Sequence, residues 1–224
     1  MAKTAIARLE GISPYSQSRP VLTPKHNKET ADAYELRTWM NRVHCDNEGV
    51  YIPAMAFRNC LAEAAKYLSI QIPGKGKATF TKHFESGLLI PSNVPLFSPV
   101  NGERIIPPSD TGLKVAAAAI DSNSRDIEYK RPPHEMYGSW VFTPVNGVPG
   151  GGTRVWKCYP IITSWTAEVT FLVIDDVITK DVFYEVLLQS GMLIGLGRFR
   201  VRNRGTYGSF VVNEMKWSEE LTVA

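Results

Sequence analysis

Apolar residues recur at helical spacing between Ala54 and Leu68, and this periodicity constrains the fold of the 224-residue chain more than any other feature. The apolar stripe consists of Phe57, Cys60, Leu61, Ala64 and Leu68, with Asn59, Glu63 and Lys66 on the opposite side. Pro53 precedes the stripe, at a position where proline suits the start of a helix. The pattern predicts a helix over residues 54–68.

A second helix is predicted over residues 179–191, "TKDVFYEVLLQSG". Its apolar stripe consists of Val182, Phe183, Val186 and Leu187. Thr179 is a good N-cap, because its hydroxyl can accept a hydrogen bond from a backbone N–H of the first turn. Gly191 is expected to end the helix.

Four segments have the character of strands: 3–9, 154–162, 166–174 and 207–217. In the third of them apolar and polar residues alternate, which is typical of a strand with one buried face. The apolar positions are Ala167, Val169, Phe171 and Val173, and the polar ones are Thr166, Glu168 and Thr170. We expect segments 154–162 and 166–174 to form an antiparallel pair.

The order strand, helix, strand, strand, helix, strand predicts an α+β protein with a ferredoxin-like (RRM-like) βαββαβ core. Residues 69–153 are dense in proline and glycine, which indicates a large insertion after the first helix. Residues 13–39 are polar and rich in turn formers, so an exposed loop or arm is expected there. The prediction is one domain, 1–224, with 69–153 as its insertion.

The composition is that of an ordinary globular protein, with 44% hydrophobic and 21% charged residues. A net charge of +3 does not by itself indicate nucleic acid, so local clusters must decide. The three cysteines are Cys45, Cys60 and Cys158, an odd number without a C-x-x-C pair, which favours neither a disulfide framework nor a thiolate zinc site. Because no segment resembles a signal peptide or a membrane span, a cytoplasmic location and no membrane partner are expected.

The stretch "GLGRFRVRNRGTYGSF", residues 195–210, places four arginines at every second position. On a strand, Arg198, Arg200, Arg202 and Arg204 would share one face. Like charges on one face repel each other unless something anionic lies against them. A phosphate backbone is such an anion, and glycines let it approach the main chain closely. The flanking glycines are Gly195, Gly197, Gly205 and Gly208. Phe199 and Tyr207 could stack with bases, whereas the alternative is an ordinary solvated strand face.

This stretch resembles the C-terminal glycine-rich loop of the RAMP superfamily, the ferredoxin-like RNA-binding proteins of CRISPR systems. The opening "GLG", the basic spacer "RFRVRNR" and the closing "GTYG" carry the resemblance, although the closing element is one residue longer than usual. The segment "YIPAMAFRNCLAEAAKYL" resembles the entry to the first helix of CRISPR backbone subunits, with Arg58 near the position of the usual lysine. The resemblance implies a protein that binds single-stranded RNA, or DNA, in a basic groove and packs beside copies of itself.

Other basic residues are candidates for the same ligand. The resemblance implies that the insertion is a thumb-like hairpin over the strand, with Lys75, Lys77, Lys82 and His83 as candidates for its basic tip; a solvated loop is the alternative. Trp39 with Arg37 and Arg42 is a plausible stacking patch. The polar passage before it adds Arg19, Lys25 and His26.

Other RAMP members are metal-independent ribonucleases, so the histidines matter. His26 lies in a basic loop and is the best candidate for a general base. His44 beside Cys45 could suggest a metal ligand or a thiol nucleophile, but without partners at a suitable spacing an ordinary role is expected. None of the four histidines has a recognisable catalytic constellation, and no metal or cofactor is indicated. We therefore expect a non-catalytic single-strand-binding protein of antiviral defence that acts as a homo-oligomer or in a multi-subunit ribonucleoprotein. The alternatives are a RAMP-type endoribonuclease that processes guide RNA and a viral mimic of a CRISPR subunit. A histidine beside the glycine-rich loop would distinguish the ribonuclease.

Overall fold

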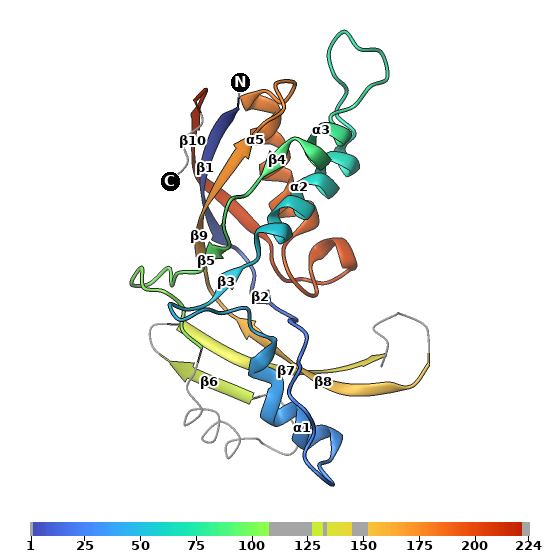
Figure 1. The fold of residues 1–224 in the computed structure, drawn as a ribbon, viewed down its shortest axis with the longest axis vertical. Coiled ribbons are helices and arrows are strands. Elements are labelled where there is room, and N and C mark those ends of the chain that lie inside the picture. Colours follow the sequence, from blue (N-terminus) through green and yellow to red (C-terminus); the bar gives the residue numbers. More distant parts are fainter. Residues whose placement is uncertain (1, 108–126, 132–133, 145–151, 221–224) are drawn as a thin grey trace.

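The computed structural model describes residues 2–107, 127–131, 134–144 and 152–220. The molecule is elongated, with one antiparallel sheet in each half (Figure 1). The upper sheet has the order β10 (Phe210–Ser218), β1 (Lys3–Gly11), β9 (Thr166–Val173) and β4 (Leu88–Leu89). The lower sheet has the order β2 (Tyr15–Ser16), β8 (Arg154–Ile162), β7 (His134–Pro144) and β6 (Ile127–Arg131). The predicted α+β class is therefore confirmed.

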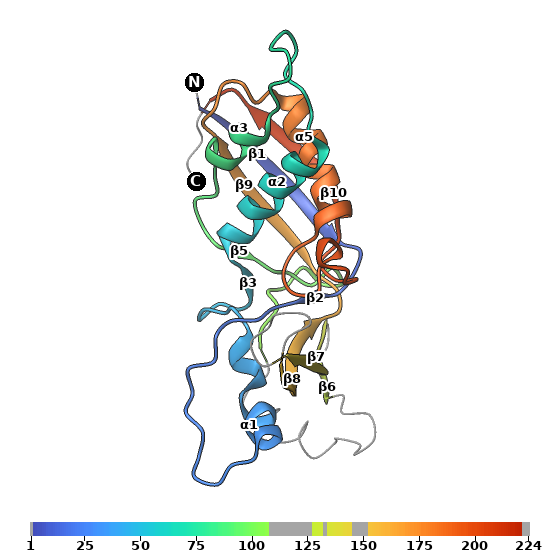
Figure 2. The same cartoon turned by 90° about the vertical axis from the view of Figure 1, so that its right-hand side faces the viewer.

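Three helices cover one face of the upper sheet (Figure 2): α2 (Ala54–Leu68), α3 (Thr81–Ser86) and α5 (Lys180–Gln189). Aromatic rings join these layers. Phe57 of α2 and Phe183 of α5 both meet Phe171 of β9 edge-on, with ring centroids 6.3 and 5.3 Å apart. Ala5 and Ala7 of β1 are fully buried, because their small side chains let the helices approach the sheet. The core of this half therefore lies between the sheet and its helices.

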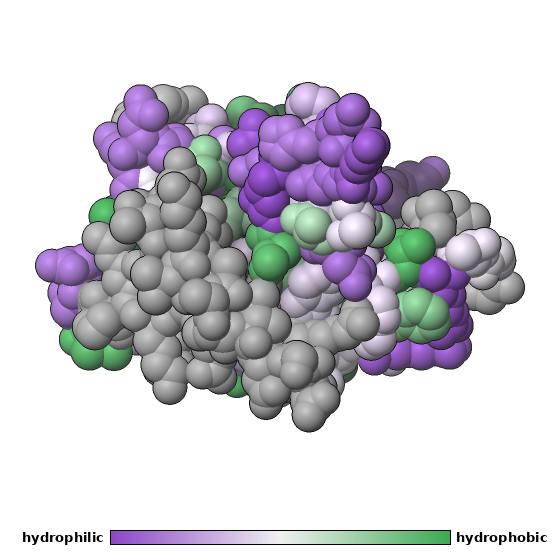
Figure 3. Space-filling view, turned by 90° about the horizontal axis from the view of Figure 1, so that it is seen from below, coloured by the Kyte–Doolittle hydropathy of each residue, from purple (hydrophilic) through white to green (hydrophobic). Residues whose placement is uncertain are grey.

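In the lower half, α1 (Ala31–Thr38) and the short 3₁₀ helix Trp39–Arg42 pack against β8. The two-stranded sheet of β3 (Tyr51–Ile52) and β5 (Val94–Pro95) lies between the two halves. Among the described residues seen from this end of the molecule, the larger surface clusters are hydrophilic, with smaller hydrophobic areas between them (Figure 3).

Side chains replace a neighbouring strand along part of β8. Glu35 accepts a hydrogen bond from the backbone N–H of Cys158 at 3.3 Å, and Arg42 Nε donates to the carbonyl of Cys158 at 3.1 Å. Glu35 also accepts from Arg42 Nη2 at 2.8 Å and from Lys157 Nζ. The buried Glu35–Arg42 pair thus satisfies the backbone of an edge that β2 is too short to cover.

Both predicted helices are present. The bounds of α2 are those predicted, and the Thr179 hydroxyl accepts from the N–H of Val182 as an N-cap. The prediction that Gly191 ends the second helix is wrong, since the chain continues as a π-helix over Ser190–Ile194 and leaves it at Gly195 with φ 74°. Gly191 is needed inside this turn because a Cβ there would collide with the carbonyl of Phe210.

The predicted pairing of segments 154–162 and 166–174 is also wrong. β8 pairs with β7 and β2 in the lower sheet, whereas β9 pairs with β1 and β4 in the upper one. The passage 13–39 contains β2 and α1 besides its loop. Segment 69–153 contributes β4 to the upper sheet and β6 and β7 to the lower one; its residues 108–126, 132–133 and 145–151 lie outside the described part. Within the described residues, no helix is both long and apolar enough to span a membrane.

Candidate nucleic-acid interface

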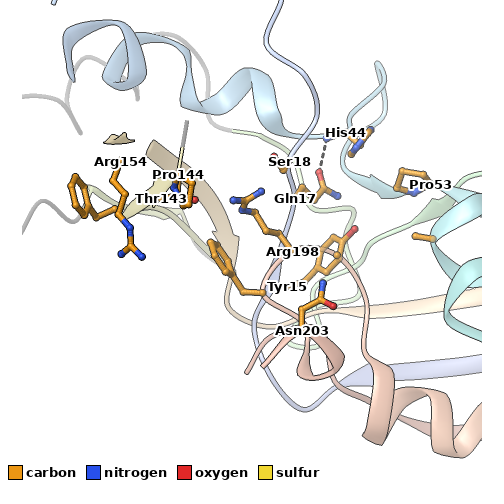
Figure 4. A pocket seen from close by; sticks show the side chains of 14 residues that line it. Tyr15, Gln17, Ser18, His44, Pro53, Thr143, Pro144, Arg154, Arg198 and Asn203 are labelled. Carbon is orange, nitrogen blue, oxygen red and sulfur yellow. Dashed lines mark hydrogen bonds between the residues drawn. The ribbon is translucent and has the colours of Figure 1, made fainter. Parts of the chain in front are cut away.

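A cleft of about 650 Å³ lies where β2, the glycine-rich loop and the end of the β7–β8 ribbon meet (Figure 4). The chain segment around β2 contributes Tyr15, Gln17 and Ser18; the segment that leads into α2 contributes His44, Pro53 and Ala56; the ribbon contributes Phe142, Thr143, Pro144 and Arg154; and the loop contributes Gly197, Arg198, Phe199 and Asn203. The cleft has the size of ordinary ligand sites. Four separate parts of the chain thus form its walls.

The arginine stretch is a compact loop, so the prediction of a strand there is wrong. Val201–Asn203 forms a 3₁₀ turn, and Phe199 and Arg204 have φ values of 56° and 63°. Left-handed residues of this kind interrupt the alternation of an extended strand. The four arginines therefore do not form one face.

The glycines of the loop have a packing role. Arg198 N–H donates to the carbonyl of Ser16 at 2.9 Å, and Gly208 N–H donates to the carbonyl of Pro14 at 2.7 Å. A Cβ on Gly197 would collide with the Ser16 carbonyl, one on Gly205 with Phe199, and one on Gly208 with Leu196. Gly195 leaves the π-helix at positive φ, beside the carbonyls of Tyr207 and Gly208. The space beside these glycines is thus occupied by the chain itself.

Two of the arginines have an intramolecular anion. Arg200 Nη2 lies 2.9 Å from Glu63 Oε2, and Arg202 Nε lies 3.0 Å from Glu63 Oε1. Arg204 is exposed at the tip of the loop. The carboxylate of α2 therefore relieves the repulsion that the sequence pattern implied.

Arg198 faces the cleft without a carboxylate partner among the described residues. Its guanidinium lies 3.9 Å from the ring centroid of Tyr159 and 4.9 Å from that of Phe199. Its Nε is buried and has no hydrogen-bond partner in the described part of the chain. Burial lowers the pKa of Arg198, with the charge of Arg42 as a smaller cause. A desolvated cation of this kind is stabilised when an anion binds beside it.

The surroundings of Arg198 carry excess positive charge. The guanidinium of Arg42 lies 5.3 Å from the centroid of the same Tyr159 ring. Lys157 forms an ion pair with Glu35, the carboxylate that also binds Arg42. The single negative charge of Glu35 is thus shared by two cations, Arg42 and Lys157, and Arg198 adds a third positive charge. Arg154 adds a further cation on the opposite wall of the cleft (Figure 4), and none of the lining residues is acidic. The cleft favours a polyanion.

His44 is the histidine that lines this cleft. Its backbone N–H donates to the Oε1 atom of buried Gln17, whose Nε2 donates to the carbonyl of Tyr51 at 2.7 Å (Figure 4). Burial lowers the pKa of the His44 imidazole, and the charge of nearby Arg19 lowers it further. The ring is therefore a neutral group at neutral pH.

The predicted stacking patch is wrong. Trp39 is 1% exposed and packs in the core beside Gly138, so no base can reach its ring. Arg42 is buried on Glu35 and Cys158. Arg37 is ion-paired to Glu29 at 2.8 Å. The tryptophan and its arginines serve the lower half internally.

The other predicted residues lie apart from the cleft or beside it. Lys25 lies 5.5 Å from the ring centroid of Tyr34, and His26 is exposed in the same loop. Arg19 is exposed just beyond the lining residue Ser18. Tyr207 meets Phe199 edge-on, with ring centroids 6.1 Å apart, and does not line the cleft.

The predicted basic tip lies at the far end of the molecule. Lys75 and Lys77 are exposed in the loop between α2 and α3, at the top of Figure 1, and Lys82 is exposed on α3. Arg58 donates to the carbonyl of Glu85 at 2.9 Å. His83 pairs with Asp175 at 2.7 Å. The structure does not bring this group together with Arg198.

Sequence reasoning missed several residues of the site. Arg154 begins β8 and Phe142 lies opposite that strand on β7, so only pairing of the ribbon places them at the cleft. The sequence pattern places Glu63 on the polar face of the first helix but does not indicate that Arg200 and Arg202 are its partners. Among the described residues, no group of three or more His, Cys, Asp and Glu could hold a metal ion.

Comparisons with known proteins add similarities of fold. No family model matches the chain, and no curated protein matches it. Among solved structures, it is similar to a chain of "Type III-B Cmr-beta bound to cognate target RNA", with 10% identity and a TM-score of 0.45 over 97% of this chain and 61% of that one. It is also similar to Cmr6 from Pyrococcus furiosus, with 10% identity and a TM-score of 0.42 over 95% of this chain and 99% of that one. The chain thus spans about three fifths of the first structure's chain. Because both TM-scores are below 0.5, the function proposed below rests on the cleft.

Proposed function

We propose that the protein binds single-stranded nucleic acid, RNA in the first place, in the cleft between its two sheets, without cleaving it. The observation that carries this proposal is Arg198, a half-buried cation with an unpaired Nε in a cleft that Arg154 also lines and no lining carboxylate enters. Phosphate oxygens supply the acceptors that such a cation lacks. RNA is preferred to DNA because the RAMP-like motifs imply it.

The upper sheet and its helices form, in this proposal, the ferredoxin-like core that carries the cleft. The strand order β10-β1-β9-β4, with α2 between β1 and β4 and α5 between β9 and β10, supports a ferredoxin-like βαββαβ core. The second strand of that core is then the two-residue β4, in place of the predicted 154–162. The lower sheet is the elaboration that completes the cleft. Packing of several copies along one strand, within a ribonucleoprotein, is what the motifs imply.

The test is the affinity of the purified protein for labelled single-stranded RNA and DNA 40-mers over a series of salt concentrations. Arg198→Met keeps a flexible chain over Tyr159 and removes the charge. We expect the parent's log K to fall linearly with log salt, and the variant's slope to be shallower by about 0.7, the contribution of one phosphate contact to a single strand. Lys66→Met, an equal charge change on exposed α2, is the control and should keep the parent slope. The proposal is contradicted if the parent binds neither the RNA nor the DNA 40-mer. It is also contradicted if the salt dependence of Arg198→Met has the same slope as that of the control.

Sedimentation of the parent with the same 40-mer tests assembly. Several protomers per oligonucleotide at saturation are expected. A single protomer on each 40-mer contradicts packing along the strand and leaves the binding proposal standing.

His44 favours a second candidate function, the metal-independent endoribonuclease. It is the histidine beside the glycine-rich loop, and its lowered pKa keeps the imidazole neutral and able to accept a proton from a 2′-hydroxyl. Cleavage of RNA but not DNA by the parent in the presence of a chelator, abolished in His44→Ala, would favour this candidate. RNA that is bound by the parent, as shown by a shift in electrophoretic mobility, but remains intact supports the non-catalytic proposal.

A further inference from the structure

An exposed aromatic ring stands on the ribbon wall of the cleft. Phe142 of β7 is 48% exposed and lines the cleft, whereas most large apolar side chains of the described residues are buried. Its ring centroid lies 5.2 Å from that of Trp156, directly opposite on β8, at an interplanar angle of 45°. The indole holds the phenyl ring from one side while the cleft leaves it accessible.

A cation follows this ring on the same face of the ribbon. Pro144 pairs with Arg154 two ladder positions beyond the Phe142–Trp156 pair, and alternate positions of a strand share a face. Arg154 is exposed and lines the cleft. The ribbon wall therefore presents a flat apolar surface followed by a positive charge.

The opposite wall of the cleft also carries a positive charge, but it has no comparably exposed aromatic ring among the described residues. Arg198 faces the cleft, but the rings next to it are engaged: Tyr159 lies under its guanidinium, and Phe199 meets both Tyr159 and Tyr207 edge-on. Of the aromatic residues that line the cleft, Tyr15 is buried in the core. Phe142 is thus the lining ring with a large accessible surface.

From this arrangement we propose that Phe142 is a stacking site for one unpaired nucleobase, with the flanking phosphates on Arg154 and Arg198. The proposal rests on the single-strand binding proposed above and adds a contact to the base. Nucleobases present an apolar face that a phenyl ring can cover, whatever their sequence, while the arginines neutralise the backbone. The site therefore distinguishes nucleic acid from other polyanions.

The experiment compares two probes of similar charge, a fluorescently labelled uridylate 12-mer and inorganic polyphosphate, which has phosphates and no bases. The 12-mer is measured directly by anisotropy and polyphosphate by competition against it. Phe142→Leu should weaken binding of the 12-mer by roughly 5- to 150-fold and leave the affinity for polyphosphate unchanged. Arg198→Met should weaken both probes. Phe142→Trp, which restores a ring, should bind the 12-mer like the parent.

Tyr67→Leu is the matched control, because Tyr67 is 60% exposed on α2 and does not line the cleft. It should bind both probes like the parent. If Phe142→Leu binds the 12-mer as tightly as the parent, or weakens both probes equally, the stacking site is overturned while the proposed function stands. If the parent itself does not bind the 12-mer, the proposed function fails and the stacking site with it. Melting curves of Phe142→Trp and Phe142→Leu show whether a loss reflects unfolding.

Discussion

Glu63 of α2 and Arg200 of the glycine-rich loop form an ion pair with 2.9 Å between Oε2 and Nη2, and Arg202 binds the other carboxylate oxygen. This carboxylate is distant in sequence from both arginines and neutralises part of the positive charge that the arginine stretch carries. The loop therefore offers its charge to the cleft mainly through Arg198. The two paired arginines become available to a ligand only if they leave Glu63.

Replacing Glu63 by glutamine should release these arginines. We expect Glu63→Gln to bind a single-stranded 40-mer more tightly at low salt than the parent does, with a salt slope steeper by up to about 1.4 if both arginines reach phosphates. The measurement is a titration at several salt concentrations. Glu85→Gln is the control, because Glu85 of α3 lines a second pocket together with Glu63 and Arg202, and no ion pair joins its carboxylate to the loop among the described residues. Equal slopes for the two variants would show that Glu63 does not compete with the ligand.

Replacing Gly197 by alanine should cost more stability than the same replacement at a glycine that has a positive φ but no close neighbour. Gly197 has φ 72° and lies against the Ser16 carbonyl, whereas Gly102 has φ 71° and nothing within 4 Å of the place where a Cβ would lie. A left-handed conformation costs an alanine about 1–2 kcal/mol. Gly102→Ala should lose that amount in denaturant unfolding, and Gly197→Ala should lose more and bind single strands more weakly. Equal losses in the two variants would contradict the close packing of the loop on β2.

Replacing Glu35 by alanine should destabilise the protein strongly. The change leaves Arg42 and the N–H of Cys158 without their buried partner, and breaking a buried pair in this way costs about 3–5 kcal/mol. Urea unfolding measures the loss. Glu168→Ala removes an exposed pair with Arg8 and should leave the midpoint close to that of the parent. A parent-like midpoint for Glu35→Ala would mean that water satisfies the edge of β8.

Asp175 should contribute stability that depends on pH. Burial raises the pKa of its carboxyl, but the hydrogen bonds from His83 and the Val177 N–H outweigh burial, so the pKa lies below its ordinary value. A carboxyl with a lowered folded pKa stabilises the fold above the unfolded pKa of about 4, and this contribution is lost as the pH falls through the folded pKa. The difference in unfolding free energy between the parent and Asp175→Asn should therefore shrink between pH 6 and pH 2.5. A difference that stays constant over this range would contradict the lowered pKa.

Elements whose causes are local can be predicted from the pattern of residues alone. The apolar stripe of 54–68 and the cap at Thr179 act within a few residues, so α2 and the start of α5 appear where the pattern predicts them. The alternation in 166–174 likewise identifies β9, with Ala167, Val169, Phe171 and Val173 buried. The class of fold follows from these elements.

Contacts between distant segments set which elements pair and which charges remain available to a ligand. A two-residue strand such as β4 carries almost no pattern, and the preference of 154–162 for a strand does not say which sheet it joins. The same holds for the arginines: Arg42 is buried on Glu35, Arg200 and Arg202 are paired to Glu63, and Arg198 faces the cleft. Charge is a property of the residue, but its partner is set by contacts between segments far apart in the chain, and local spacing carries no information about them.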